Sequence, residues 1–180
     1  MLVLPEYPPA ARPGAQPVEL DAHRPQSRLQ QLAGEIPLAY APELLQQSCA
    51  RLIRQRSIDF LLVACWPYLI GPAILASVGK AALNLHPSLL PAYRGADPVG
   101  RQIELGERRL GVSLHLLSQR FDAGDIVARA SLPSLGDNPD RETIEREAAR
   151  LGAGLFIDAL KGYDAGWQLQ PQSALTAVPD

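Results

Sequence analysis

The sequence predicts an α/β fold with a Rossmann-like, mostly parallel open sheet flanked by helices. Short apolar runs typical of strands alternate with segments of helical periodicity along most of the chain. The run 60–65 is continuously apolar after Asp59, as a strand buried on both faces requires. Proline and glycine punctuate the segments, so the elements are short and well separated.

Local start and stop signals place the individual elements. Pro42 and Pro98 suit the first turn of a helix, and Asp97 is a suitable N-cap for the second of these helices. Gly34 and Gly79 suit the ends of helices. We therefore expect strands at 2–4, 36–40, 60–65, 81–86, 110–117 and 126–131, and helices at 25–33, 42–56, 72–78, 98–105 and 140–160.

Composition fits one globular domain. The chain has 180 residues, an ordinary length for one core, of which 47% are hydrophobic and 20% charged. We expect a single domain over 1–180, with a proline-rich irregular start at 1–25 and an irregular tail at 162–180. The formal net charge of −2 provides no basic surface for nucleic acid.

Cysteine usage and hydropathy favour the cytoplasm. Cys49 and Cys65 lie in apolar segments, which favours buried thiols in a reducing compartment over a disulfide or a metal site. The N-terminus lacks the charged flank of a signal peptide, and the apolar run 60–70 is short and contains Pro67. We expect a cytoplasmic protein without a membrane partner.

The stretch from Asn84 to Gly95 has the pattern of a functional site. Asn84 and His86 interrupt an apolar run at i and i+2, so in a strand both side chains point to the same face. Pro87 and Pro91 bracket a turn that cannot continue a sheet ladder, so the strand must end at His86. An amide donor beside an imidazole suits acyl transfer, in which one group stabilises an oxyanion and the other moves a proton. On spacing alone, a satisfied structural pair is the alternative.

Three blocks of sequence follow one another within the region 58–131. They are Asn84-Leu85-His86-Pro87-Ser88-Leu89-Leu90-Pro91 with Tyr93-Arg94-Gly95 and Pro98, then Gly111-Val112-Ser113, then Phe121-Asp122-Ala123-Gly124-Asp125. This order resembles the folate-dependent formyltransferases, the family of methionyl-tRNA formyltransferase and glycinamide ribonucleotide transformylase. Both ends of the chain match less well, and we expect the family's opening βα unit to be missing here.

The resemblance implies a catalytic set and a formyl donor. Asn84 and His86 match the first two catalytic positions of the family, and Asp122 matches the third. The implied reaction is formyl transfer from 10-formyltetrahydrofolate to an amine. Asn84 and protonated His86 then stabilise the oxyanion, while Asp122 supports His86 and helps to remove a proton. No metal is implied, and the sequence has no spacing of metal ligands.

The resemblance also implies where the folate and the acceptor bind. The loop after the strand 60–65 lies where open α/β sheets bind ligands, and in the family it lines the pterin pocket; apolar packing over the core is the alternative. The expected folate-binding residues are Trp66, Pro67, Tyr68, Leu69, Ile70, Phe121 and Gly124. The expected acceptor-binding residues are Ser88, Leu89, Leu90 and Arg94. Arg94 has an acceptor carboxylate or phosphate as one expected partner and Asp97 as the other.

Other polar residues have weaker claims. His115 sits on a predicted strand, where a lone histidine is more often structural, and Asp125 belongs to a turn whose acids commonly bond nearby backbone. Ser88 lacks a Gly-X-Ser-X-Gly elbow, which argues against a serine hydrolase. A nucleotide-binding module is disfavoured because Gly-X-Gly-X-X-Gly is absent. The serious alternative is a non-catalytic relative that binds folate or a protein partner, which a missing opening unit favours.

Charge and length bear on the acceptor. Binding of tRNA draws on many phosphate contacts, whereas this chain has 17 Lys and Arg against 19 Asp and Glu. We expect no further domain after the last helix. The expected acceptor is therefore a small amine, such as an amino sugar or an amino-acid derivative. A shortened sheet leaves an apolar edge, so a homodimer is expected.

Overall fold

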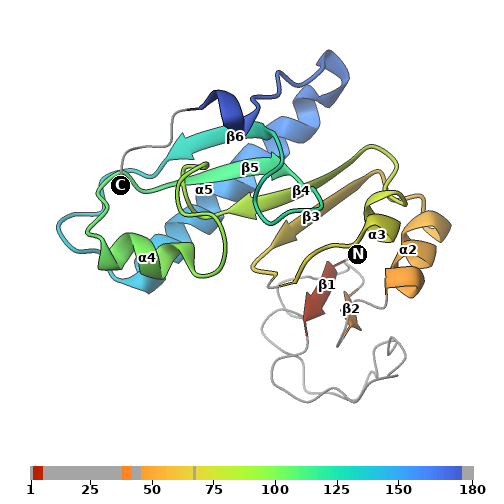
Figure 1. The fold of residues 1–180 in the computed structure, drawn as a ribbon, viewed down its shortest axis with the longest axis horizontal. Coiled ribbons are helices and arrows are strands. Elements are labelled where there is room, and N and C mark those ends of the chain that lie inside the picture. The colour runs from red at the N-terminus through yellow and green to blue at the C-terminus, as the bar shows by residue number, and fades with distance from the viewer. Residues whose placement is uncertain (1, 6–37, 42–45, 67, 176–180) are drawn as a thin grey trace.

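The computed structural model describes residues 2–5, 38–41, 46–66 and 68–175. Its strands form two sheets (Figure 1). A two-stranded parallel sheet joins β1 (Leu2–Pro5) to β2 (Leu38–Ala41). The larger sheet has the strand order β3-β4-β5-β6, and these strands span Phe60–Ala64, Ala81–His86, Gly111–Leu116 and Ile126–Ser131.

The helices lie close to their predicted positions. Within the described residues they are α2 (Gln46–Gln55), α3 (Pro72–Leu75), α4 (Pro98–Glu104) and α5 (Arg141–Gly162), with 3-10 turns η1 (Tyr163–Ala165) and η2 (Gln172–Ala174). The helix predicted at 25–33 lies outside the described residues. None of the described helices is long and apolar enough to cross a membrane.

The larger sheet is mixed, which corrects the prediction of a mostly parallel sheet. β3 and β4 are parallel, but β5 is antiparallel to both β4 and β6. In the register of β4 with β5, Ser113 near the start of β5 pairs with His86 at the end of β4. The chain therefore re-enters the sheet at the edge where β4 ends, and β5 runs back from there.

Helices cover both faces of the larger sheet. On one face, α2 and α3 pack on β3 through a cluster centred on Ala50, Ile53 and Ile74. On the other face, α5 passes across β4 and β5 and packs on Leu83 and Leu114 (Figure 1). Because side chains alternate along a strand, the neighbours of Leu83 on β4 and of Leu114 on β5 point to the face without α5.

The buried stripe of α5 differs from the prediction. The apolar spacing predicts Ile144, Ala148, Leu151 and Leu155 as the stripe. Ile144 and Ala148 are buried, but the stripe then passes through Gly152 and Ala159, and the two leucines are only half-buried. A Cβ at Gly152 would collide with the Leu85 side chain, so glycine lets α5 approach β4 closely.

The strands predicted at 2–4 and 36–40 are present as β1 and β2, which pair in parallel, while residues 6–37 lie outside the described part. The missing opening βα unit therefore stays a prediction. The tail, predicted to be irregular from residue 162, is partly ordered by the sheet. Gln170 forms a two-hydrogen-bond bridge with Ile126 at the start of β6, with both N···O distances 2.9 Å.

Two glycines of α5 provide a matched test of this packing. Gly152→Ala should destabilise the protein by about 1–3 kcal/mol, because the added methyl overpacks the contact with Leu85. Gly154→Ala meets nothing within 4 Å and should stabilise it by about 0.5–1 kcal/mol through helix propensity. Urea unfolding of both variants measures the difference. Equal effects would mean that α5 does not pack this closely on β4.

Candidate active site

Two neighbouring strands present polar side chains on the face of the sheet that lacks α5. Asn84 and His86 end β4, and on β5 their direct cross-strand partners are His115 and Ser113. The antiparallel register therefore places a second histidine beside Asn84. His86 and His115 are both buried, with 4% and 1% of their surface exposed.

The turn after His86 is held by its own polar groups. The Ser88 hydroxyl donates to the Ala92 carbonyl at 2.7 Å, and the Leu90–Pro91 peptide is cis. Tyr93 has a φ of 58° and Gly95 a φ of 93°, both in the left-handed region. This path brings the Tyr93 carbonyl back to the His86 ring, where it accepts a hydrogen bond from Nε2 at 2.9 Å.

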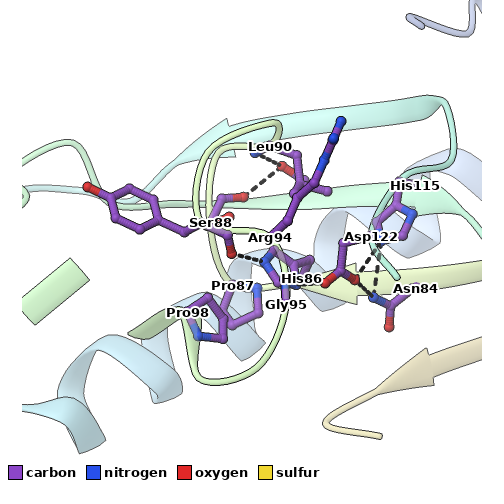
Figure 2. Close-up of polar contacts among 12 residues, drawn as sticks. Asn84, His86, Pro87, Ser88, Leu90, Arg94, Gly95, Pro98, His115 and Asp122 are labelled. Atoms are coloured by element: carbon purple, nitrogen blue, oxygen red, sulfur yellow. Dashed lines mark hydrogen bonds and ion pairs between the residues drawn. The ribbon is translucent and has the colours of Figure 1, made fainter. Parts of the chain in front are cut away.

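The loop between β5 and β6 supplies a carboxylate to the same place. Asp122 lies between His86 and His115 (Figure 2). Its Oδ2 accepts from the Gly95 backbone N–H at 2.9 Å and lies 3.5 Å from His86 Nδ1. Its Oδ1 accepts from Asn84 Nδ2 at 3.2 Å and lies 3.5 Å from His115 Nε2. The carboxylate is thus the common partner of both strands and of the turn.

Gly124 explains why this loop can approach the sheet. A Cβ at Gly124 would overlap the Leu116 carbonyl oxygen, so any larger residue would push the loop away from β5. Asp122 itself has a φ of 47°, a left-handed conformation that aspartate adopts more readily than most residues. Glycine at 124 and a left-handed aspartate at 122 therefore set the position of the carboxylate.

The hydrogen-bond partners assign protons to both rings. A carbonyl only accepts, so His86 carries a proton on Nε2, toward Tyr93, and in its neutral form has a lone pair on Nδ1, toward Asp122. His115 Nδ1 lies 2.8 Å from the Leu116 carbonyl and carries the proton by the same argument. In the neutral ring, His115 Nε2 then accepts from Asn84 Nδ2 at 3.1 Å.

These contacts orient the Asn84 amide. Asp122 and His115 both need a donor from it, so the NH2 group faces them and the carbonyl oxygen faces away. The two acceptor atoms lie 3.5 Å apart, and both contact the Asn84 Nδ2 atom, which holds the NH2 group toward the cluster.

Burial dominates the electrostatics of the cluster. Burial lowers the pKa of His86 below its usual value, and it outweighs the Asp122 carboxylate and the Tyr93 carbonyl, which raise it. For Asp122, burial alone would raise the pKa, but His115, His86 and the Gly95 N–H together bring it below its usual value. Near neutral pH the cluster therefore contains a neutral His86 beside an ionised Asp122.

The expected folate-binding residues differ in how far their side chains are exposed. Tyr68, Leu69 and Phe121 are exposed, at 60%, 42% and 55%, which is unusual for large apolar side chains and suits a flat ring ligand. Ile70 is buried in the core cluster beside α3, Gly124 is buried under Leu116, and Pro67 lies outside the described residues.

Trp66 offers a further test of the fit to folate. Its indole Nε1 is buried and has no hydrogen-bond partner within the described part of the chain. Leu117, which precedes the Asp122 loop, packs on the same apolar cluster as Trp66, so the two expected walls of the pocket are adjacent. Apolar ring surfaces with an unused N–H donor fit a pterin, which has both flat faces and acceptor atoms.

The expected acceptor-binding residues are placed less simply. Ser88 and Leu90 are completely buried, and the Leu90 N–H and the Ser88 carbonyl both bond the Ser113 hydroxyl, which holds the shape of the turn. Leu89 is half-buried. Arg94 is exposed, but its partner is Gln172 and not Asp97, which pairs with Arg141.

A separate hollow of about 810 Å³ lies beyond the turn. Its walls come from α4, the segment 106–110 and the segment 131–139. It meets the turn at Glu107, which accepts a hydrogen bond from the Tyr93 hydroxyl at 3.0 Å. Its lining does not include Asn84, His86, His115 or Asp122, so we place no part of the reaction in it.

Two members of the polar network escaped the sequence analysis. His115 was given a weak claim because its contacts depend on pairing between β4 and β5, which the local sequence does not contain. Gln172 was assigned to an irregular tail, but it is buried and bonds the Asp122 loop. An amide in a tail gives no signal until the tail is seen to cover the sheet.

The fold and the cluster define an α/β protein in which an amide, two imidazoles and a carboxylate meet at the carboxyl end of β4. The chain belongs to the formyl transferase family, since the family's sequence model, described as "Formyl transferase", matches residues 11–160. Members of this family are folate-dependent transferases of one-carbon groups. The recognition made from the three sequence blocks is therefore confirmed.

Individual relatives differ in what they are named for. The methionyl-tRNA formyltransferase of Lactobacillus delbrueckii subsp. bulgaricus is 33% identical over 135 residues, which cover 75% of this chain but 42% of that protein. The chain thus spans less than half the length of such relatives. A phosphoribosylglycinamide formyltransferase from Bacillus halodurans has the same fold, with a TM-score of 0.67, 22% identity, and coverage of 79% of this chain and 78% of that one.

A third comparison contains ligands. The formyltransferase PseJ from Anoxybacillus kamchatkensis, solved with UDP-4,6-dideoxy-4-formamido-L-AltNAc and tetrahydrofolate, has a TM-score of 0.62 and 24% identity, with 78% of this chain and 72% of that chain covered. At these identities the two structures establish the fold alone. The similar proteins therefore include one named for a tRNA, one named for a ribonucleotide and one solved with a nucleotide sugar.

The lowered pKa of His86 predicts a pH dependence of stability. Above the usual histidine pKa of about 6.5, His86 is neutral in both the folded and the unfolded chain, so it adds no pH dependence there. Below it, the unfolded chain binds a proton that the folded chain resists, so stability falls as the pH drops toward the lowered value. Urea unfolding at several pH values between about 7.5 and 5 should show this fall, and His86→Gln should reduce it. An unchanged pH dependence in that variant would contradict the assignment.

Proposed function

We propose that this chain transfers a formyl group from 10-formyltetrahydrofolate to the amine of a small acceptor. The observation that carries the proposal is the convergence of Asn84, His86 and Asp122 on one face of the sheet, at the end of β4. In the overall reaction, the acceptor nitrogen bonds to the formyl carbon and the bond from that carbon to N10 breaks. One proton passes from the acceptor nitrogen to N10.

Asn84 stabilises the charge that develops on the formyl oxygen. The NH2 group of Asn84 donates to this oxygen, and its contacts with Asp122 and His115 keep the amide from rotating. Fixed donors of this kind are effective because they need no reorientation during the reaction, and the loss of one costs about 10²–10³ in rate.

His86 moves the proton, with support from Asp122. Its Nδ1 is unprotonated in the resting neutral ring, so it accepts the proton that the acceptor nitrogen releases, directly or through water. Asp122 Oδ2, at 3.5 Å, favours the imidazolium that results, which also stabilises the oxyanion. His86 then gives the proton to N10 as the carbon–nitrogen bond breaks. This order of proton transfers refines the expectation from the amino-acid sequence, in which His86 is protonated from the start.

The folate is proposed to lie between the loop 66–72 and the loop 118–125. The exposed rings of Tyr68 and Phe121 and the unused Trp66 N–H support this place. With its formyl group at the Asn84 amide, the donor covers the cluster and excludes water from it, which strengthens the hydrogen bonds to the oxyanion. The cytoplasmic location, the single domain over 1–180 and the homodimer stay predictions.

The acceptor is proposed to be a small amine rather than a tRNA. The chain has 17 basic and 19 acidic residues, so its net charge does not attract phosphates. The site itself is compact, with buried side chains on the turn that follows β4. Amino sugars and amino-acid derivatives are the first classes to examine.

Two measurements test this proposal directly. Calorimetry with tetrahydrofolate should detect binding, and incubation with 10-formyltetrahydrofolate and a panel of amino sugars and amino acids should yield a formylated product by mass spectrometry. Binding without any product across the panel would instead support the non-catalytic, folate-binding alternative. No binding would refute both.

The two acids of one loop provide a matched kinetic test. Asp122→Asn should lower the transfer rate about 10²–10⁴-fold, because the amide cannot favour the imidazolium. Asp125→Asn makes the same change three residues away, outside the cluster, and should leave the rate near that of the wild type. Circular dichroism of both variants checks the fold. A similar loss in both would point to damage of the loop and not to a role of Asp122.

Filter binding distinguishes the acceptor classes. Initiator tRNA should show only weak retention by this chain at about 50 mM salt and none at about 200 mM, since few phosphate contacts are available. A yeast tRNA of the same size is the control for non-specific retention. Tight, selective, salt-sensitive binding of the initiator tRNA would overturn the small-amine proposal.

A further inference from the structure

Gln172 is a buried amide at the edge of the candidate active site. Only 5% of its surface is exposed, although it lies in the segment that follows α5. Its Nε2 donates to the Asp122 carbonyl at 2.8 Å and to the Gly124 carbonyl at 2.7 Å. Its Oε1 accepts from Arg94 Nε at 2.8 Å and also from Arg94 Nη2. One side chain therefore bonds both the carboxylate loop and the turn after β4.

These partners require an uncharged amide in one orientation. Two carbonyl oxygens can only accept, so they fix the NH2 group of Gln172 on the side of the loop. A guanidinium can only donate, so it fixes the oxygen on the opposite side. Glutamate would place a carboxylate oxygen against two carbonyls, and a hydrocarbon side chain would leave all three partners without a bond. Glutamine alone among residues of its size satisfies both sides.

The backbone around Gln172 is anchored independently of these bonds. Gln170 bridges to Ile126 at the start of β6, and the Trp167 indole donates to the Ala159 carbonyl on α5 at 2.9 Å. Gln172 then begins the 3-10 turn η2. The segment is thus fixed to the sheet and to a helix before it reaches the loop, so its amide provides a fixed point against which the loop can rest.

The bonds of Gln172 complete a second connection between the turn and the loop. The first connection is the Gly95 N–H bonded to the Asp122 carboxylate. The second runs from Arg94, the residue before Gly95, through Gln172 to the backbone of Asp122 and Gly124. Without it, the side chain of Asp122 keeps its contacts but its backbone loses a support, in a loop that carries a left-handed residue.

We infer that Gln172 is a positioning residue of this site, which together with Arg94 sets the distance between the Asp122 carboxylate and the His86 imidazole. Arg94 thereby acquires a role within the protein in place of the expected contact with the acceptor. The consequence for catalysis rests on the proposed function, but the geometric claim does not. Gln172 also lies outside the part of the chain, 11–160, that matches the family.

The test uses Gln172→Met in the full chain, with Gln168→Met as control. Methionine has nearly the volume of glutamine and no charge, so any change in the titration of His86 reports on the position of Asp122. Gln168 is an exposed residue of the same segment, so the control makes the same substitution outside the network. Proton NMR follows the histidine C–H resonances against pH, with His86→Gln used to assign the signal of His86.

In Gln172→Met the pKa of His86 should fall by roughly 1 unit, because a displaced carboxylate favours the imidazolium less. In Gln168→Met it should equal the wild-type value. An unchanged pKa of His86 in a folded Gln172→Met protein would overturn the inference and leave Gln172 a purely structural residue. If Gln172→Met does not fold, Gln172→Asn, which is too short to reach both sides, takes its place and should shift the pKa in the same direction.

Turnover provides a separate readout. With an acceptor found in the amine panel, Gln172→Met should lower kcat about 10²-fold, the usual effect of a small misplacement of a catalytic group, with a smaller change in the KM for the acceptor. The NMR titration needs neither folate nor acceptor. A chain that never transfers a formyl group, but shows the shift of His86, would therefore refute the proposed function and support the inference. A rise in KM at constant kcat would contradict it.

Discussion

The ionised carboxylate of Asp122 is the interaction on which the rest of the site depends. A charge that is largely removed from water must be compensated by donors, and this one accepts from the Asn84 amide and the Gly95 N–H, with the rings of His86 and His115 at 3.5 Å. They come from β4, β5 and the turn, so a single buried charge requires three segments to be in place at once. Neither the Asn84 amide nor the Gly95 N–H depends on the charge of a ring for its hydrogen bond to this carboxylate.

The mixed sheet is what makes this arrangement possible. Because β5 runs antiparallel to β4, the pairing places His115 opposite Asn84 and Ser113 opposite His86, with all four side chains on one face. A slip of β5 by one residue against β4 would turn Ser113 and His115 toward α5 and its leucines. The same leucines therefore fix the register: burying Leu83 and Leu114 on one face commits Asn84 and His115 to the other.

The sequence was informative where the signal is local and uninformative where it is not. The end of β4 at His86 follows from Pro87, and the turn after it was predicted from Pro87 and Pro91. The predicted direction of β5 was wrong, because alternating elements are consistent with parallel or mixed order, and the direction depends on pairing between β4 and β5 that the local sequence does not contain. The roles of His115 and Gln172 could not be found, since each depends on contacts between segments that are far apart in the chain.

The contribution of Gln172 changes what counts as the functional unit. The family match ends at residue 160, and the three sequence blocks end at Asp125, yet the loop that carries Asp122 rests on an amide twelve residues beyond that match. The bridge between Gln170 and Ile126 ties this segment to β6, so the sheet, the loop and the tail form one connected structure. Short motifs determine which reacting groups lie near one another. Their separation at the scale of a hydrogen bond is set by a residue that belongs to no motif, because positioning requires only that some donor reach two carbonyl oxygens from a fixed backbone.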